Sequence, residues 1–274
     1  MARVYPLLGL LPLLGLGELA AHQYFASRAP DPHDYAALGR ALLKLKRPGV
    51  PIVVAPSWAE PLVRAAAPAA FPIGELTRAD DSGFAELLEV SLLGEEAPEL
   101  AGLTRKTPRV LGRFVVTEIE NPKAAPPSFD FVTAVDLGQV EVYLDNAGVR
   151  SPCPLVSVAG PTTGGLHGHA AYPERRLQCS TDRFVTVSLT EDADYRPHRC
   201  ILTRLPSRGR LVLRFTGVPR AARLLAFGGF AYFLERDAVE PQVSLTVSDE
   251  RAELGARRFA GAGGWARWPL GGTE

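Results

Sequence analysis

The residues with the clearest capacity for chemistry lie in the second half of the chain, and two histidines come first. His167 and His169 stand one residue apart in a glycine-rich loop. A His-x-His pair supplies two metal ligands when a carboxylate or a third histidine converges on it. No nearby residue is spaced as that third ligand, so we predict no metal. The two histidines are kept as candidates for ligand binding on a solvated loop.

Carboxylates and hydroxyls carry no catalytic signature. Glu191, Asp192 and Asp194 follow an expected strand and could hold Ca²⁺ through oxygen ligands. The loop lacks further patterned acceptors, so a plain acidic turn is the better interpretation. The chain has no Gly-x-Ser-x-Gly elbow. The turn Ala55–Trp58 has neither a Gly-x-Gly-x-x-Gly nor a Walker-type pattern. We therefore predict no catalytic residue and no cofactor.

An aromatic and basic motif, Gly264–Trp268 (GWARW), lies close to the end of the chain. Trp265 and Trp268 are three residues apart, so on a strand they face opposite sides, and one should be buried while the other is exposed. An exposed tryptophan beside Arg267 could stack on the face of a sugar. A rim residue that packs on its own sheet is the simpler interpretation. Trp268 and Arg267 are the candidate ligand-binding residues of this motif.

Three cysteines occur, Cys153, Cys179 and Cys200. In an exported protein they could form one disulfide and leave one thiol over. The spacing alone does not determine the pairing. We choose Cys153–Cys179, which would close a glycine- and proline-rich loop of 25 intervening residues. Three reduced, buried cysteines are the alternative if the chain stays in the cytosol.

The N-terminal segment indicates whether the chain is exported or stays in the cytosol. Met1–Arg3 carries one positive charge, and Val4–Gly17 is uncharged and dominated by leucine, as in a signal-peptide core. Cleavage after Ala21 is one interpretation. An uncleaved anchor of about 20 residues, which contacts the membrane through residues 4–25, is the one that we favour. Both interpretations predict that residues 1–28 are a leader and that the rest of the chain is extracytoplasmic. The chain would then be anchored at the periplasmic face of the inner membrane or secreted.

Residues 31–121 alternate helical and strand patterns. A helix is expected after Asp31, with Leu38 and Leu42 on its apolar face. Ser57 and Glu60 have the spacing of a capping box. Strands are expected at 50–55, 71–76, 88–92 and 113–120. We predict a small α/β domain with a mostly parallel sheet.

Residues 122–128 have the composition of a linker, and beyond them the hydrophobic period becomes two. Short alternating strands are expected at 140–144, 185–189, 211–215 and 243–248, and two core strands are expected to meet at Gly228-Gly229. Helical patterns are missing between them, which predicts a jelly-roll-like β-sandwich over 129–274. The whole chain is expected to be a two-domain α+β protein behind an N-terminal helix.

Two weak family resemblances follow from these motifs. Pro51–Trp58, Leu88–Leu92 and Gly112–Asn121 resemble the extracytoplasmic α/β region of lipid-A-arabinose and dolichyl-phosphate-mannose-type glycosyltransferases. Val243–Val247 and Gly264–Trp268 are similar to galactose-binding-like sandwiches. Those transferases keep their chemistry on many transmembrane helices, whereas this chain has one apolar segment at most. The resemblance implies an accessory or stand-alone relative in a glycan-facing setting, with no catalytic residue carried over.

We therefore predict a bacterial-type envelope protein that binds a glycan or a partner protein without catalysis. A hydrolase of envelope carbohydrate with a site at the domain junction is the first alternative, which convergent acids of raised pKa would favour. A structural assembly module is the second, which a contiguous apolar patch would favour. Basic and acidic residues number 30 each, which argues against a nucleic-acid partner.

Overall fold

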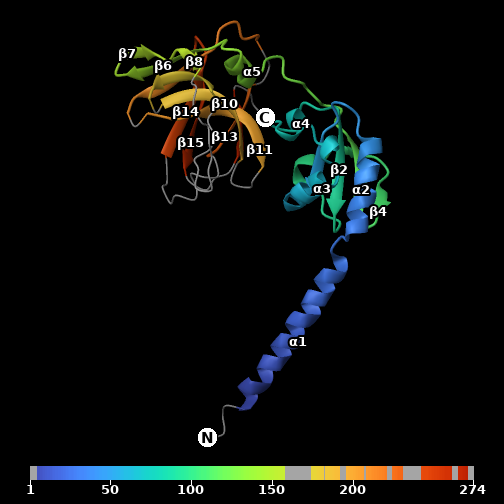
Figure 1. Ribbon diagram of the computed structural model, residues 1–274. Helices are drawn as coiled ribbons and strands as arrows, with labels where there is room; N and C mark the ends of the chain where they lie inside the picture. Colours follow the sequence, from blue (N-terminus) through green and yellow to red (C-terminus); the bar gives the residue numbers. More distant parts are fainter. Residues whose placement is uncertain are drawn as a thin grey trace. The chain divides into compact units, whose positions relative to one another are not determined.

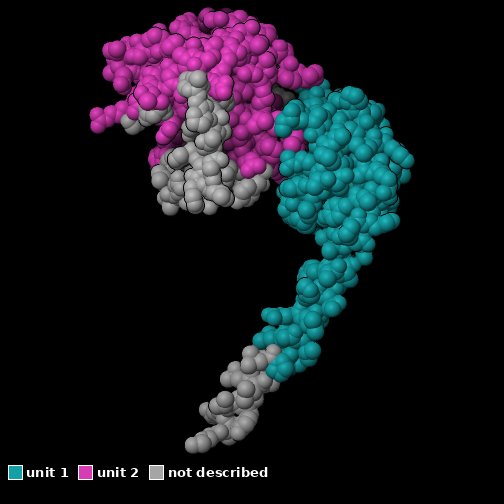
Figure 2. All heavy atoms as spheres, in the orientation of Figure 1, with its two compact units in different colours: residues 1–75, 81–125 teal, residues 76–80, 126–274 magenta. Residues whose placement is uncertain are grey.

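The computed structural model describes residues 5–157, 174–181, 183–191, 196–206, 208–220, 224–230, 242–260 and 265–270 (Figure 1). The protein is a mixed α and β structure in which most of the described regular structure is β-sheet. Its internal contacts divide it into two compact units (Figure 2). Unit 1 comprises residues 1–75 and 81–125, and unit 2 comprises residues 76–80 and 126–274.

The segment predicted to be a leader forms one helix, α1 (Tyr5–Arg28), which contains Pro12. Its apolar side chains from Leu13 onward are exposed, Leu13 and Phe25 each to 68%. Among the residues that the structure describes, no helix is both long enough and apolar enough to cross a membrane.

The predicted helix after Asp31 is confirmed as α2 (Pro32–Leu45). Asp31 accepts a hydrogen bond from the Asp34 amide at 2.8 Å, and Asp34 accepts one from the Asp31 amide at 3.1 Å. This reciprocal pair satisfies two amides that the first helical turn leaves without partners. Leu38 and Leu42 are fully buried and attach the helix to unit 1.

The sheet of unit 1 runs in the order β1-β2-β5-β3, and β4 also pairs with β5. Its strands are β1 (Ile52–Ala55), β2 (Glu86–Leu92), β3 (Thr104–Arg105), β4 (Arg109–Leu111) and β5 (Phe114–Glu120). Only β1 and β2 pair in parallel; the other three described pairings are antiparallel. The prediction of a mostly parallel sheet is therefore wrong. Parallel strands need a long crossover, and the short turn at Gly112 instead returns β5 antiparallel to β4.

Two local predictions in the β1–β2 crossover are also wrong. The expected strand at 71–76 is replaced by η2 (Pro68–Ala70) and α4 (Ile73–Leu76). Ser57 does not cap a helix but begins the short 3₁₀ turn η1 (Ser57–Ala59), and α3 (Glu60–Ala66) has no side-chain cap. The Glu60 carboxylate lies 3.3 Å from the Arg64 guanidinium, so the i,i+4 ion pair replaces the capping box.

One carboxylate is buried inside the sheet of unit 1. Glu89, on β2, is 1% exposed and accepts a hydrogen bond from the Ala97 amide at 2.8 Å. Both carboxylate oxygens also bond to the Arg105 guanidinium on β3. The pair fixes the loop that contains η3 (Pro98–Leu100) against β2, because an unpaired buried carboxylate would be costly.

Unit 2 contains two antiparallel sheets with a shared core. One has the order β11-β10-β9-β8 and the other β12-β6-β7. Their strands are β6 (Glu141–Asn146), β7 (Val149–Pro152), β8 (Leu155–Ser157), β9 (Arg175–Ser180), β10 (Arg183–Glu191), β11 (Pro197–Thr203) and β12 (Arg210–Arg214). The predicted strands at 140–144, 185–189 and 211–215 are confirmed. The core takes apolar side chains from both sheets, including Val142, Leu211, Leu213, Leu177, Val185 and Ile201.

Two further strand pairs complete the described part of unit 2. β13 (Leu224–Gly228) pairs with β16 (Ala266–Leu270), and β14 (Gln242–Ser248) pairs with β15 (Glu253–Ala260). The strand predicted at 243–248 is thereby confirmed. A short helix that the sequence pattern did not indicate, α5 (Phe131–Asp136), covers part of the four-stranded sheet.

Candidate functional site

The predicted disulfide is confirmed. Cys153 and Cys179 are bonded across a sequence separation of 26 residues, and Cys200 is the free thiol. Cys153 is 3% exposed and lies in the core between the two sheets of unit 2. A disulfide in this position fits an oxidising, extracytoplasmic environment. Burial raises the pKa of the Cys200 thiol, so that cysteine is a poor nucleophile.

The other predicted site residues do not come together. His167 and His169 lie outside the described residues, as do Asp192 and Asp194. Within the described ranges, no group of three or more histidine, cysteine, aspartate or glutamate side chains could hold a metal ion. Arg267 is exposed on β16, and Trp268 beside it is half-buried.

The two tryptophans of the GWARW motif are both half-buried, so the prediction that one would be exposed is wrong. The Trp265 ring stacks on His198 of β11, with centroids 4.3 Å apart and planes at 12°. Trp268 packs against β15, where a Cβ added to Gly255 would lie 3.4 Å from its Cζ2. Trp265 and Trp268 therefore each contact another strand of unit 2.

Sequence reasoning missed a hollow that opens on unit 2 beside α5. It is shallow, with a cavity volume of about 10 Å³, which is room for about one water molecule. Its described lining residues come from α5, β8, β9 and β10 and are Val135, Asp136, Leu155, Arg175, Arg176, Leu177, Val185, Thr186 and Val187. Most of its aliphatic residues are buried, whereas Leu155 is 43% exposed and Arg175 is exposed.

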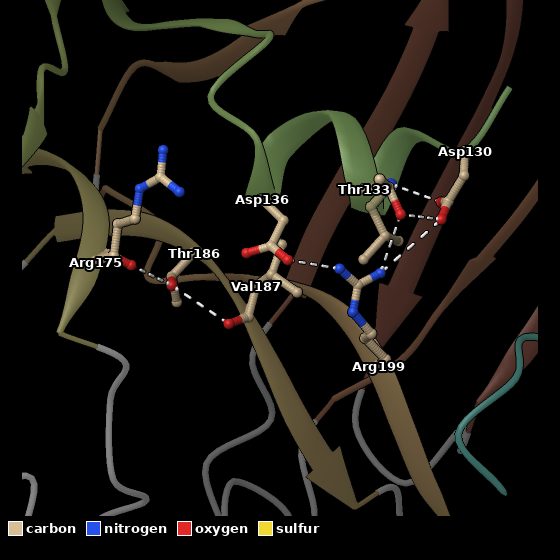
Figure 3. A network of polar contacts seen from close by, with 8 residues as sticks. Asp130, Thr133, Asp136, Arg175, Thr186, Val187 and Arg199 are labelled. Carbon is tan, nitrogen blue, oxygen red and sulfur yellow. Dashed lines mark hydrogen bonds and ion pairs between the residues drawn. The ribbon is translucent and has the colours of Figure 1, made fainter. Parts of the chain in front are cut away.

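Helix α5 is fixed at this hollow by capping and by one arginine. Asp130 caps the helix by accepting from the Val132 amide at 2.9 Å. The Arg199 guanidinium, from β11, donates to Asp136 Oδ2 at 2.7 Å and to Thr133 Oγ1 at 3.3 Å (Figure 3). A helix of six residues is too short to be stable alone, so these contacts hold it on the sheet.

The backbone at the start of β9 is also fixed. The Thr186 hydroxyl, on β10, donates to the Arg175 carbonyl at 2.9 Å. Thr186 is 3% exposed, so this bond is shielded from water. Gly138, just after α5, has a φ of +72°, and a Cβ there would lie 3.4 Å from Leu155 Cδ2 and 3.7 Å from Arg175 Nη2. Gly138 therefore lies close to both Leu155 and Arg175.

Arg175 is the cation of this hollow that has no partner among the residues that the structure describes. Its exposed guanidinium points away from the hydrogen-bonded network in Figure 3. Arg176 instead donates to Gln178 Oε1 at 2.5 Å and lies over the Phe184 ring at 5.1 Å. The Asp136 carboxylate is already paired with Arg199. Among the described lining residues, Arg175 is therefore the cation that is available to a ligand.

The chemistry of these groups suits binding. Among the described residues of the lining there is no histidine, cysteine or serine, and the one carboxylate is held in an ion pair. A general acid and base, or a nucleophile with an adjacent base, would need further groups within hydrogen-bond reach. A guanidinium with free N–H groups is by contrast a ready donor to an oxyanion.

Comparison of the chain with protein-family models, with curated proteins and with solved structures gives no match. The resemblances noted in the sequence therefore stay predictions. The available signal for the hollow in the sequence was the doublet Arg175-Arg176 at the start of a strand. That doublet does not reveal the hollow, because Val135 and Leu155, which also line it, come from separate segments.

Proposed function

We propose that the protein is a non-catalytic binding protein of the extracytoplasmic space, and that it binds a glycan on the surface of unit 2 around this hollow. The observation that carries this proposal is that the exposed Arg175 guanidinium and the 43% exposed Leu155 side chain border the same hollow. Sugars present both polar edges and apolar C–H faces, and a site for them needs both kinds of group.

The surrounding structure supports a preformed site. The Cys153–Cys179 disulfide joins the segment before β8 to β9, and both strands contribute to the wall. Arg199 fixes α5, which forms the opposite side. A site held by a disulfide and an ion pair loses little conformational freedom when a ligand binds. In this proposal the two sheets are those of a jelly-roll-like sandwich, as the sequence pattern suggested.

The volume of the hollow limits what can enter it. About 10 Å³ is far below the roughly 300–1,000 Å³ typical of small-molecule pockets. A glycan would therefore lie across the surface at the rim of the hollow and would not enter it. A hydrolase would in addition need two carboxylates flanking the scissile bond, and Asp136 is the one carboxylate among the described lining residues. We therefore favour binding over hydrolysis.

Two leucines of the same sheet give a matched test. Leu155 lines the hollow and is 43% exposed, whereas Leu189 on β10 is 54% exposed and is not part of the lining. The oxidised full chain would be screened on an array of neutral and charged oligosaccharides. Leu155→Ala should weaken the binding that is found, and Leu189→Ala should leave it unchanged.

Two outcomes would overturn the proposal. One is that no oligosaccharide on the array binds to the oxidised, folded protein. The other is that glycan binding is found but that both leucine variants retain it fully, because the glycan site would then lie elsewhere. Circular dichroism of each variant shows that the fold is intact.

A further inference from the structure

We propose that two copies of this chain pair along the outer edge of β14. Their β14–β15 hairpins would then form one antiparallel sheet of four strands about a two-fold axis. This interface does not depend on the proposed glycan-binding function. It follows from the exposure of β14, from its lack of charge and from the order of its residues.

β14 is an exposed edge strand. Among the strands that the structure describes it pairs with β15 alone, so the backbone groups along its other edge have no partner strand there. Five of its seven side chains are exposed, and the one large apolar side chain of the five, Leu245, is exposed to 41%. An open strand edge of this kind is a template on which another strand can pair.

β14 also lacks the features by which proteins protect their edge strands. Charged residues, prolines and very short strands keep sheet edges from pairing with other molecules. Other described edges of unit 2 have such protection, since β12 begins and ends with arginine, β7 contains Arg150 and Pro152, and β11 begins with Pro197. Gln242–Ser248 contains neither a charged residue nor a proline, and it is the longest described edge strand of which this is true.

The residue order of β14 is complementary to itself. If two copies run antiparallel with Leu245 opposite its own copy, Val243 lies opposite Val247 and Ser244 lies opposite Thr246. Apolar residues then meet apolar residues, and hydroxyls meet hydroxyls, which are cross-strand pairs that stabilise a sheet. The contact is the same from both sides, so it closes on itself as a two-fold dimer and does not extend into a fibre.

The apolar pairs of this register lie on one face of the strand. Val243, Leu245 and Val247 alternate with polar residues and therefore share a side. The two valines are already half-buried, so Leu245 carries most of the apolar surface that remains exposed. Pairing would place the two Leu245 side chains next to each other at the axis and remove part of that surface from water.

The hairpin is held in a conformation that is ready to pair. At its turn, Asp249 accepts hydrogen bonds from the amides of Arg251 and Ala252, each at 2.8 Å. At its open end, the Arg258 guanidinium of β15 donates to the Gln242 side-chain oxygen. An edge that is fixed at both ends loses little conformational freedom when a second strand is added.

The arginines of β15 do not oppose this pairing. Arg257 and Arg258 lie opposite Leu245 and Ser244 within the hairpin, on the side away from the proposed axis. In the paired sheet the two β15 strands would be three strand spacings apart, which is about 14 Å. This distance exceeds the Debye length of about 8 Å at physiological ionic strength, so the contact is between two neutral edges.

Sedimentation equilibrium of the oxidised full chain tests the proposal, in a mild non-ionic detergent that covers the exposed apolar residues of α1. A single strand pair is smaller than a standard interface of about 1,600 Å², so we expect a monomer–dimer equilibrium in the micromolar range. Leu245→Lys and Leu245→Glu should each weaken it about tenfold or more, because like charges then lie opposite each other at the axis. An equimolar mixture of the two variants should restore the dimer, because opposite charges then meet.

Two controls test position and direction. Leu189→Lys alters a leucine that is 54% exposed on β10, a strand paired on both sides, and it should leave the association unchanged. Ser244→Lys and Thr246→Glu combined in one chain should retain the dimer, because the antiparallel register brings opposite charges together at both positions. A parallel pairing would instead place like charges opposite each other and dissociate this double variant. Circular dichroism verifies that each variant is folded.

Three results would overturn the proposal. One is a chain that stays monomeric up to about 0.1 mM. A second is a Leu245→Lys variant that associates as the wild type does, since the contact would then lie elsewhere, for example on α1. The third is a mixture of the Leu245→Lys and Leu245→Glu variants that remains monomeric, because position 245 would then not lie at the two-fold axis. None of these results bears on glycan binding, which is measured separately.

Discussion

The buried disulfide gives the sharpest prediction about stability. Cys153→Ala and Cys179→Ala together remove a cross-link from the core of unit 2. In the loop-closure description, a cross-link stabilises the folded state because it lowers the entropy of the unfolded chain. The double variant should therefore fold to the same structure and unfold more easily.

The expected size follows from the length of the closed loop. The two cysteines are separated by 26 residues, and the loop-closure relation gives about 3.5 kcal/mol at 25 °C for a loop of that length. Typical domains are stable by roughly 5–15 kcal/mol. Removing the disulfide should thus cost unit 2 a large share of its stability.

The assay must report on unit 2 alone, and the tryptophans allow this. Trp265 and Trp268 are half-buried in unit 2, whereas Trp58 in unit 1 is 63% exposed. In a Trp58→Phe background, fluorescence during guanidinium unfolding follows unit 2. The m-value should rise slightly when the cross-link is lost, because the unfolded chain can then expand.

Cys200→Ala is the matched control, since it removes the free thiol and leaves the cross-link in place. Thiol titration of denatured, unreduced wild type should find one thiol, and three after reduction. An extrapolated free energy of unfolding that changes by less than about 0.5 kcal/mol in the double variant would refute the loop-closure reasoning.

Three further changes have predictable effects. Arg105→Met removes the ion-pair partner of the buried Glu89 carboxylate and should destabilise unit 1 by about 3 kcal/mol. Arg109→Met is the control, because the Arg109 side chain is 56% exposed and its loss should cost under about 0.5 kcal/mol. Thermal unfolding compares the two variants. Gly138→Ala should cost about 1 kcal/mol because φ is +72°, and an unchanged melting temperature would contradict this. The Gly148 amide and an arginine hold the pKa of Asp145 below its ordinary value of 3.8. The contribution of Asp145 to folding stability is therefore fully present above pH 3.8 and is lost as the pH falls through the lower pKa of the folded state. A carboxyl titration by NMR in which Asp145 has a midpoint at or above 3.8 would contradict this prediction.

Local patterns in the sequence predicted the elements whose partners are close in the chain or whose faces alternate strictly. The helix after Asp31 follows from its capping residues and its apolar spacing. The strands around Val142 and Val185 follow from their period of two, because one face of each is buried in the core. Strand direction was not predictable in this way, since β1 and β5 have similar apolar runs but opposite orientations relative to β2.

The candidate hollow was not predictable, because its parts are far apart in the sequence. Val135, Leu155 and Arg175 belong to three elements, and none of these elements alone indicates a site. At the aromatic motif Gly264–Trp268, by contrast, the sequence suggested an exposed feature that the structure does not have. Its composition suggested an exposed tryptophan, but His198 of a distant strand packs on Trp265 and removes one face from solvent.

Two arginines on the same sheet show why geometry is needed to assign a role. Arg175 and Arg199 both occupy strands of the four-stranded sheet, and both lie beside α5. Arg199 is saturated, since it meets a carboxylate at 2.7 Å and a hydroxyl at 3.3 Å, so its charge is used to hold the helix. Arg175 is exposed instead, and its guanidinium has no carboxylate partner among the described residues. The same residue type is therefore structural at one position and available for a ligand at the other.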